Sequence, residues 1–199
     1  MKNKEENVDF VVFNGDLIHD EQGLLPEVRQ VFDQFQVPSY VTRGNHDRVD
    51  ESTFMQVMRQ PTNFSFIEKD DYGVILLDSS NISGDYRCAD LEFTKLILDE
   101  YQKLTHVFIF IHISQNDWTR HGIECKAFLD LITSYSNVTA TFHGHDHDVD
   151  GQMLYHRKPF LWSGHFGGNW GNPFPSYRVC EIGEDGSAVS YLKRISDGL

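Results

Sequence analysis

The chain has 199 residues, enough for one α/β domain with a substantial core. Hydrophobic residues make up 40% of it, an ordinary share for a globular protein that excludes disordered and fibrous classes. The 30 acidic residues outnumber the 17 Lys and Arg, and the net charge of -13 disfavours binding to the phosphate backbone of nucleic acid. We therefore predict a single domain over residues 1–199 without a nucleic-acid footprint.

No segment has the pattern of a membrane span or a secretory signal. The longest apolar runs, such as 107–111, are far shorter than the roughly 18 residues of a spanning helix. Residues 1–10 contain lysines but no following apolar stretch, so the sequence predicts a cytoplasmic protein with no membrane partner. Cys88, Cys125 and Cys180 are widely spaced and include no Cys-x-x-Cys pair, which favours three free structural thiols.

Strand-type and helix-type patterns alternate along the chain, which favours an α/β fold. Apolar runs predict strands at 8–13, 37–42, 63–68, 73–78, 107–111 and 138–142. Apolar residues at three- and four-residue spacing predict helices at 25–35, 51–59, 89–104 and 123–135. The sequence after residue 151 is β-rich, with a Gly- and Pro-containing loop followed by predicted strands at 177–182 and 188–194.

Polar residues that can bind metal follow four of these predicted strands. They are Asn14-Gly15-Asp16, the segment Arg-Gly-Asn-His-Asp at 43–47, His112, and the segment His-Gly-His-Asp-His at 143–147. Ligand sites of open α/β sheets gather at the carboxyl ends of the strands. One shared site would therefore account for all four segments.

Each segment alone also has a structural explanation. Asn, Gly and Asp are common turn formers, so residues 14–16 and 44–47 fit turns, and His112 fits a half-buried, hydrogen-bonded histidine. The last segment is more specific, because His145 and His147 point to the same side of an extended chain. They can approach one ion or two adjacent ions.

In this order, the segments closely resemble the sequence blocks of the calcineurin-like metallophosphoesterase superfamily. Those blocks are Asp-x-His, Gly-Asp, Gly-Asn-His-Asp/Glu, a single His and Gly-His-x-His, and all but the first are present between residues 8 and 147. The resemblance implies a sandwich of two mixed β-sheets flanked by helices. It also implies a two-metal site at the strand ends.

Carried over to this chain, the resemblance implies a set of metal ligands. Asp16 would bridge both metals through its two carboxylate oxygens. Asn45, His112 and His145 would complete the shell of the second metal, and His147 would join Asp16 at the first. Nitrogen and oxygen ligands without a thiolate suit manganese, iron, zinc or magnesium and do not choose among them.

The resemblance further implies hydrolysis of a phosphomonoester or phosphodiester by a metal-bound hydroxide. The family histidine at the position of His46 is not a ligand; it lies over the phosphate, where it stabilises charge or protonates the leaving oxygen. Arg43 is a candidate to hold a phosphate oxygen, and an exposed strand-end arginine is the alternative. The expected partner is a small phosphorylated molecule, with cyclic nucleotides, nucleotides, glycerophosphodiesters and phosphosugars all open.

The Asp-x-His block is missing, because only a short segment precedes Asp16 and it contains no histidine. The first metal would then keep only Asp16 and His147, fewer than the about three protein ligands of most catalytic metal sites. One hypothesis is that the fold lacks its first strand-helix unit, which would expose a sheet edge suited to a homodimer. The other is a natural variant with one metal, and the alternative function is a non-catalytic metal-binding or interaction protein.

Three further groups of residues are weaker candidates. His19 and Asp20 are candidates to contact His46 and orient its ring. The segment 162–170 either lines a substrate cleft or forms a packed aromatic loop. The remaining histidines fit ordinary surface or strand-end positions, namely His106, His121 and His156.

Overall fold

The structure, a computed structural model, describes residues 8–195 of the chain. Its helices are α1 (Leu25–Phe32), α2 (Glu51–Met58), α3 (Leu91–Glu100) and α4 (Lys126–Ser134), with short 3-10 turns at Gln22–Leu24 and Tyr101–Lys103. The first strands are β1 (Val11–Asn14), β2 (Ser39–Thr42), β3 (Phe64–Glu68), β4 (Tyr72–Leu77), β5 (His106–Ile111) and β6 (Val138–His143). The last are β7 (Gln152–Tyr155), β8 (Lys158–Trp162), β9 (Ser176–Ile182) and β10 (Ala188–Arg194). These elements confirm the predicted α/β alternation and the β-rich C-terminal part.

The largest sheet is mixed and has six strands in the order β3-β4-β5-β6-β8-β7. Its centre, β4 to β8, is parallel, and the edge strands β3 and β7 pair antiparallel. The second layer differs from the expected continuous sheet. Among the described residues it consists of two separate pairs, the parallel pair β1-β2 and the antiparallel hairpin β9-β10.

Side-chain alternation on β5 divides the core between the two faces of the large sheet. Val107, Ile109 and Ile111 are fully buried with the apolar residues of α3 and α4. Phe108 lies on the opposite face, in a cluster that includes Phe10 before β1 and residues of the β9-β10 hairpin. Since each fully buried aliphatic side chain contributes roughly 1.5–3 kcal/mol, both layers are held firmly against the sheet.

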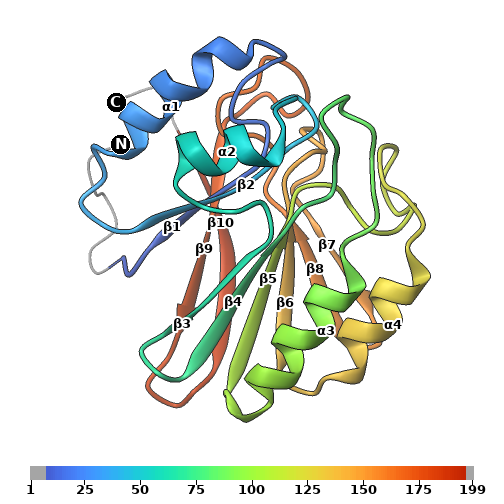
Figure 1. Ribbon diagram of the computed structural model, residues 1–199. Coiled ribbons are helices and arrows are strands. Elements are labelled where there is room, and N and C mark those ends of the chain that lie inside the picture. The colour runs from blue at the N-terminus through green and yellow to red at the C-terminus, as the bar shows by residue number, and fades with distance from the viewer. Residues whose placement is uncertain (1–7, 196–199) are drawn as a thin grey trace.

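The helices cover the two outer faces of this double layer. Figure 1 shows α3 and α4 over the large sheet and α1 and α2 beside β1 and β2. The amphipathic face of α1 buries Leu25 and Phe32 against Phe54 and Met58 of α2. The expected sandwich flanked by helices is therefore confirmed. None of the described helices is long and apolar enough to cross a membrane.

Two of the three cysteines form a disulfide. Cys88 and Cys125 are bonded, with their Cα atoms 5.6 Å apart, so the prediction of three free thiols is wrong; Cys180 is free. Cys88 lies on the loop after β4, and Cys125 directly precedes α4 on the segment after β5. Because β4 and β5 are parallel neighbours, the segments that leave their ends run side by side, which a sequence separation of 37 does not reveal.

We predict that the double variant Cys88→Ser/Cys125→Ser has a free energy of unfolding about 2–4 kcal/mol lower than the wild type, because the disulfide restricts the unfolded chain. Urea unfolding followed by circular dichroism measures this difference. The matched control, Cys180→Ser, removes the free thiol and should unfold like the wild type. Equal midpoints for the double variant and the control would contradict the prediction.

Candidate metal centre

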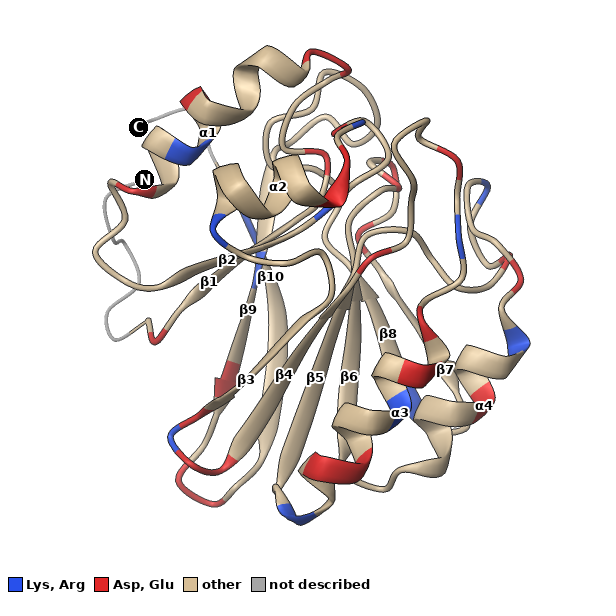
Figure 2. Cartoon of the chain, in the orientation of Figure 1, with Lys and Arg blue, Asp and Glu red and all other residues tan. Residues whose placement is uncertain are grey.

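The four sequence segments meet at one edge of the double layer. β1 and β2 run parallel, as do β5 and β6, so the residues that follow these strands emerge at neighbouring strand ends. Acidic residues recur on the loops above the strands, with few Lys and Arg among them (Figure 2). An acidic surround of this kind attracts cations.

Two glycines allow the segments to approach closely. A Cβ on Gly44 would lie 2.1 Å from the backbone nitrogen of Asp16, and a Cβ on Gly144 would lie 2.3 Å from the carbonyl oxygen of Asn14. Any side chain at either position would separate these backbones. Asp16 itself has a φ of 51°, a left-handed conformation that Asp tolerates better than most residues.

Three metal-competent side chains converge at this edge. Asp16, His112 and His145 each offer a ligand atom within 4.8 Å of the others. The Nε2 atom of His112 lies 3.1 Å from Oδ2 of Asp16, and both histidines are buried. Burial raises the pKa of Asp16, but the adjacent His112 outweighs it and holds that pKa well below the usual range, so the carboxylate is ionised.

Buried polar atoms without partners mark where a cation fits. Asn45 Oδ1, His112 Nε2 and His145 Nδ1 are buried and form no hydrogen bond within the described part of the chain. An unsatisfied buried acceptor costs about 1–3 kcal/mol, and a cation would satisfy all three together with Asp16. Two nitrogens and two oxygens form a suitable donor set for a first-row divalent metal. The residues present therefore fit a bound metal.

The second ring nitrogen of each histidine is already engaged. His112 Nδ1 lies 2.6 Å from the carbonyl oxygen of Asn14, and His145 Nε2 lies 2.8 Å from the hydroxyl of Tyr86. A carbonyl only accepts, so His112 carries its proton on Nδ1 and presents a lone pair at Nε2 when neutral. Burial and the nearby His112 lower the pKa of His145 to about 3, which keeps this ring neutral.

His46 lies at the rim of this group. Its backbone N–H donates to Asp16 Oδ1 at 2.9 Å, and its ring is half-buried. Asp20 Oδ1 lies 3.0 Å from His46 Nδ1 and 3.0 Å from Nε of Arg48, and the ring of His19 stacks on that of His46 at 4.4 Å. The structure thus places Asp20 and His19 against His46, as the sequence suggested.

Asp47, the neighbour of His46, has a different task. Its Oδ1 accepts the backbone N–H of Leu17 at 2.7 Å and that of Ile18 at 3.1 Å, and its Oδ2 accepts the N–H of Gly44 at 2.6 Å. The side chain is fully buried. Asp47 therefore ties the loop after β1 to the loop after β2.

Arg43 is neither an exposed arginine nor placed to bind phosphate. Its side chain is buried, and its guanidinium donates to both carboxylate oxygens of Asp78 and to the carbonyl oxygens of Val49 and Ser80. A buried guanidinium must satisfy its donors within the protein, and the carboxylate and carbonyls take them up. We therefore correct the expectation and treat Arg43 as a structural anchor of the loop after β2.

His147 is close enough to Asp16 and His112 for their charges to influence it, and its Nδ1 is also buried without a hydrogen-bond partner in the described part of the chain. Its ring stacks on Trp170 at 4.3 Å and lies 5.4 Å from that of His165, and it joins no group of three candidate ligands in the described part of the chain. Trp162 at the start of the aromatic segment is buried in the core, whereas Trp170 is 46% exposed at the rim. Packing in the core is therefore confirmed for Trp162, and the lining of a substrate cleft by the rest of the segment stays a prediction.

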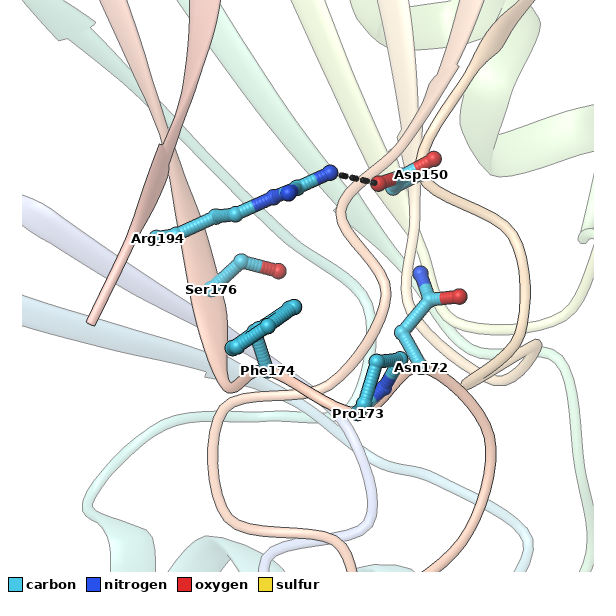
Figure 3. A pocket seen from close by; sticks show the side chains of 6 residues that line it. All are labelled: Asp150, Asn172, Pro173, Phe174, Ser176 and Arg194. Carbon is cyan, nitrogen blue, oxygen red and sulfur yellow. Dashed lines mark ion pairs between the residues drawn. The ribbon is translucent and has the colours of Figure 1, made fainter. Parts of the chain in front are cut away.

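The loop that carries Trp170 is hydrogen-bonded to the segment that carries His147. The N–H of Asn172 donates to the carbonyl oxygen of His147 at 2.9 Å. A pocket of about 90 Å³ lies next to it, where Arg194 pairs with Asp150 at 3.8 Å and its guanidinium lies 5.4 Å from the ring of Phe174 (Figure 3). None of the residues that line this pocket belongs to the metal-competent cluster.

Two residues near the metal-competent cluster were not predicted as site residues. Tyr86 contacts His145 from the loop after β4, and no motif includes it. His121, expected to be an ordinary surface residue, lies with its ring 5.6 Å from that of His145 and 6.2 Å from that of Trp170. Only the fold brings these residues to the site.

Three solved structures share the fold. A dimetal phosphatase from Danio rerio has a TM-score of 0.63 and 16% identity, with 78% of this chain and 72% of that chain covered. The sulfate thiohydrolase SoxB of Thermus thermophilus has a TM-score of 0.60 and 10% identity, with 94% and 38% covered. The calcineurin-like phosphoesterase YfkN of Bacillus subtilis has a TM-score of 0.52 and 14% identity, with 93% and 76% covered.

Sequence comparison identifies a family but no individual curated relative. No curated protein sequence matches this chain at a significant level. A family model, in contrast, matches residues 2–149, which include every segment of the metal-competent cluster. With that match over most of its length, and with the fold to accompany it, the chain belongs to the calcineurin-like phosphoesterase family.

Proposed function

We propose that this protein is a metal-dependent phosphoesterase that hydrolyses a phosphomonoester or phosphodiester with water. The observation that carries the proposal is the group of Asp16, His112 and His145 with Asn45 on the adjoining loop. In this group Asn45 Oδ1, His112 Nε2 and His145 Nδ1 are buried without a hydrogen-bond partner among the described residues. Family membership supports the same reaction class. Manganese, iron, zinc and magnesium all suit this donor set.

A divalent cation held by these four side chains would polarise a phosphoryl oxygen and make nearby water more acidic. The protein keeps the ligands ready for it. Asp16 is ionised, His112 is fixed by the Asn14 carbonyl, and His145 is neutral. Since the side chains are preorganised, binding a cation requires little rearrangement.

His46 is the residue placed to act on the leaving group. Asp20 accepts a hydrogen bond from Nδ1 of His46, so the opposite nitrogen is the one that serves the substrate. Water forms a new bond to phosphorus and gives up a proton to solvent, while the bond from phosphorus to the leaving oxygen breaks. The Nε2 proton of protonated His46 passes to that leaving oxygen. His46 is therefore the proposed general acid and Asp20 its positioning residue.

The competing function is a non-catalytic metal-binding protein of the same fold. The lack of an Asp-x-His segment in this sequence favours this candidate, because Asp16 and His147 alone give only two ligands for a first metal. Both functions predict cation binding. They differ in whether His46 is needed for turnover.

The disulfide supports a proposal about the compartment. Disulfides persist in oxidising environments and are rare in the cytosol. The Cys88–Cys125 pairing therefore favours an oxidising compartment over the cytoplasm expected from the sequence.

Cation binding is the first prediction. Protein stripped with chelator should bind Mn²⁺ in isothermal titration calorimetry, and 100 times the Kd of Mn²⁺ should raise the free energy of unfolding by about 2.7 kcal/mol. Asn45→Ala and His112→Ala should each weaken binding at least about 10-fold, because each removes a donor. His156→Asn, a change in the β7–β8 turn, is the matched control. Equal affinity in all four proteins would exclude this cluster as the cation site.

The second prediction concerns turnover. With Mn²⁺, the wild type should hydrolyse bis-(p-nitrophenyl) phosphate, and His46→Ala should lower kcat by about 10²- to 10⁴-fold through loss of the general acid. Asp20→Asn should cause a smaller loss, since it only misdirects the His46 ring. Neither variant should change the Kd of Mn²⁺. A folded wild type that binds Mn²⁺ without turnover would support the non-catalytic function instead.

The third prediction concerns the thiols. Protein taken from its own cells and labelled at once with a polymer-linked maleimide should react at one cysteine, Cys180. After reduction and unfolding, three cysteines should react. Three reactive thiols without reduction would overturn the proposed oxidising compartment.

A further inference from the structure

The loop after β4 sends one side chain into the metal-competent cluster. The hydroxyl of Tyr86 lies 2.8 Å from Nε2 of His145, and the two rings meet edge to face at 4.9 Å. Tyr86 is 37% exposed, whereas His145 is only 6% exposed. No family motif described above contains this tyrosine.

The position of Tyr86 is tightly fixed. Ser80 and Tyr86 form an antiparallel bridge, and the N–H of Arg87 donates to the carbonyl oxygen of Ser79 at 2.8 Å. At the tip of this loop, a Cβ on Gly84 would lie 2.7 Å from the carbonyl oxygen of Asn45. The Cys88–Cys125 disulfide secures the loop two residues beyond Tyr86.

The contact assigns different tasks to the two nitrogens of His145. Its Nδ1 is buried without a partner, in the group with Asp16 and His112. A neutral imidazole has one N–H and one lone pair, so a cation on Nδ1 requires the proton on Nε2, where the Tyr86 hydroxyl is placed to accept it. The same hydrogen bond prevents the ring from turning its carbon atoms towards the cluster.

We propose that Tyr86 is a positioning residue that holds His145 in the tautomer and orientation needed to bind a divalent cation through Nδ1. The inference rests on the cation of the proposed function and is independent of turnover. Partners of this kind typically change metal affinity by 10- to 100-fold. Removal of the hydroxyl alone should therefore weaken cation binding while the fold is retained.

The test compares Tyr86→Phe with the matched control Tyr155→Phe, which removes a hydroxyl at the end of β7. Isothermal titration with Mn²⁺ should give a Kd about 10- to 100-fold higher for Tyr86→Phe and an unchanged Kd for Tyr155→Phe. Thermal unfolding without metal should show the same Tm for the two variants within about 2 °C, since Tyr86 is partly exposed.

A second readout separates positioning from a general structural role. In metal-free protein with ¹⁵N-labelled histidine, the Nε2–H proton of His145 should be visible by NMR in the wild type and in Tyr155→Phe. In Tyr86→Phe it should broaden through exchange with water. An equal Kd for the two variants, or an unchanged Nε2–H signal in Tyr86→Phe, would overturn the inference.

The outcomes also separate this inference from the proposed function. Weaker Mn²⁺ binding by Tyr86→Phe in a protein without turnover would support the inference and contradict the phosphoesterase function. Turnover in the wild type with equal Mn²⁺ affinity in both variants would contradict the inference alone. A wild type that does not bind Mn²⁺ would overturn both.

Discussion

The whole site depends on the close approach of the loops after β1 and β2, which Asp47 enforces. Its buried carboxylate accepts three backbone N–H groups, two from the first loop and one from the second. A buried N–H without a partner is costly, so the three N–H groups keep both loops close to this side chain. With the loops held in this way, Gly44 rests against Asp16, and Asn45 and His46 come to the same place.

The large sheet supplies the other half of the site through the alternation of its side chains. On β5 the residues that face α3 and α4 are odd-numbered, and Phe108 faces the second layer. His112, two positions beyond Phe110, continues on the second-layer face and reaches the Asn14 carbonyl at the end of β1. A ligand from one layer is thus oriented by the backbone of the other, so the site requires both layers to pack correctly.

The sequence predicted the parts of this structure that depend on local pattern. Apolar runs located the strands, and the polar residues after them located Asp16, His112 and His145 in one cluster. Asn45 lies between Gly44 and His46, which both contact Asp16. Contacts between distant loops left no local trace. The Cys88–Cys125 disulfide is one example, because it depends on β4 and β5 being neighbours.

Arg43 and Tyr86 are two residues whose roles could not be predicted from the local sequence. Arg43 follows a strand at a position where an arginine can bind phosphate. Its guanidinium instead donates to the carboxylate of Asp78, which follows a different strand. Tyr86 has no recognisable pattern around it, yet it contacts a candidate ligand. Whether a polar side chain binds a substrate or stabilises the fold depends on the groups around it, and those groups are distant in the sequence.

The contacts of the two Asp16 carboxylate oxygens affect how many cations the described residues can bind. One carboxylate oxygen accepts the backbone N–H of His46, and the other lies beside His112. A second cation beside Asp16 would need about three protein ligands. Within residues 8–195, His147 belongs to no group of three candidate ligands. By contrast, Asp16, His112 and His145 already form one group, with Asn45 on the adjoining loop and the tautomer of neutral His112 fixed by the Asn14 carbonyl. Among the described residues, the observed geometry therefore supports one cation at Asp16, His112 and His145 most directly.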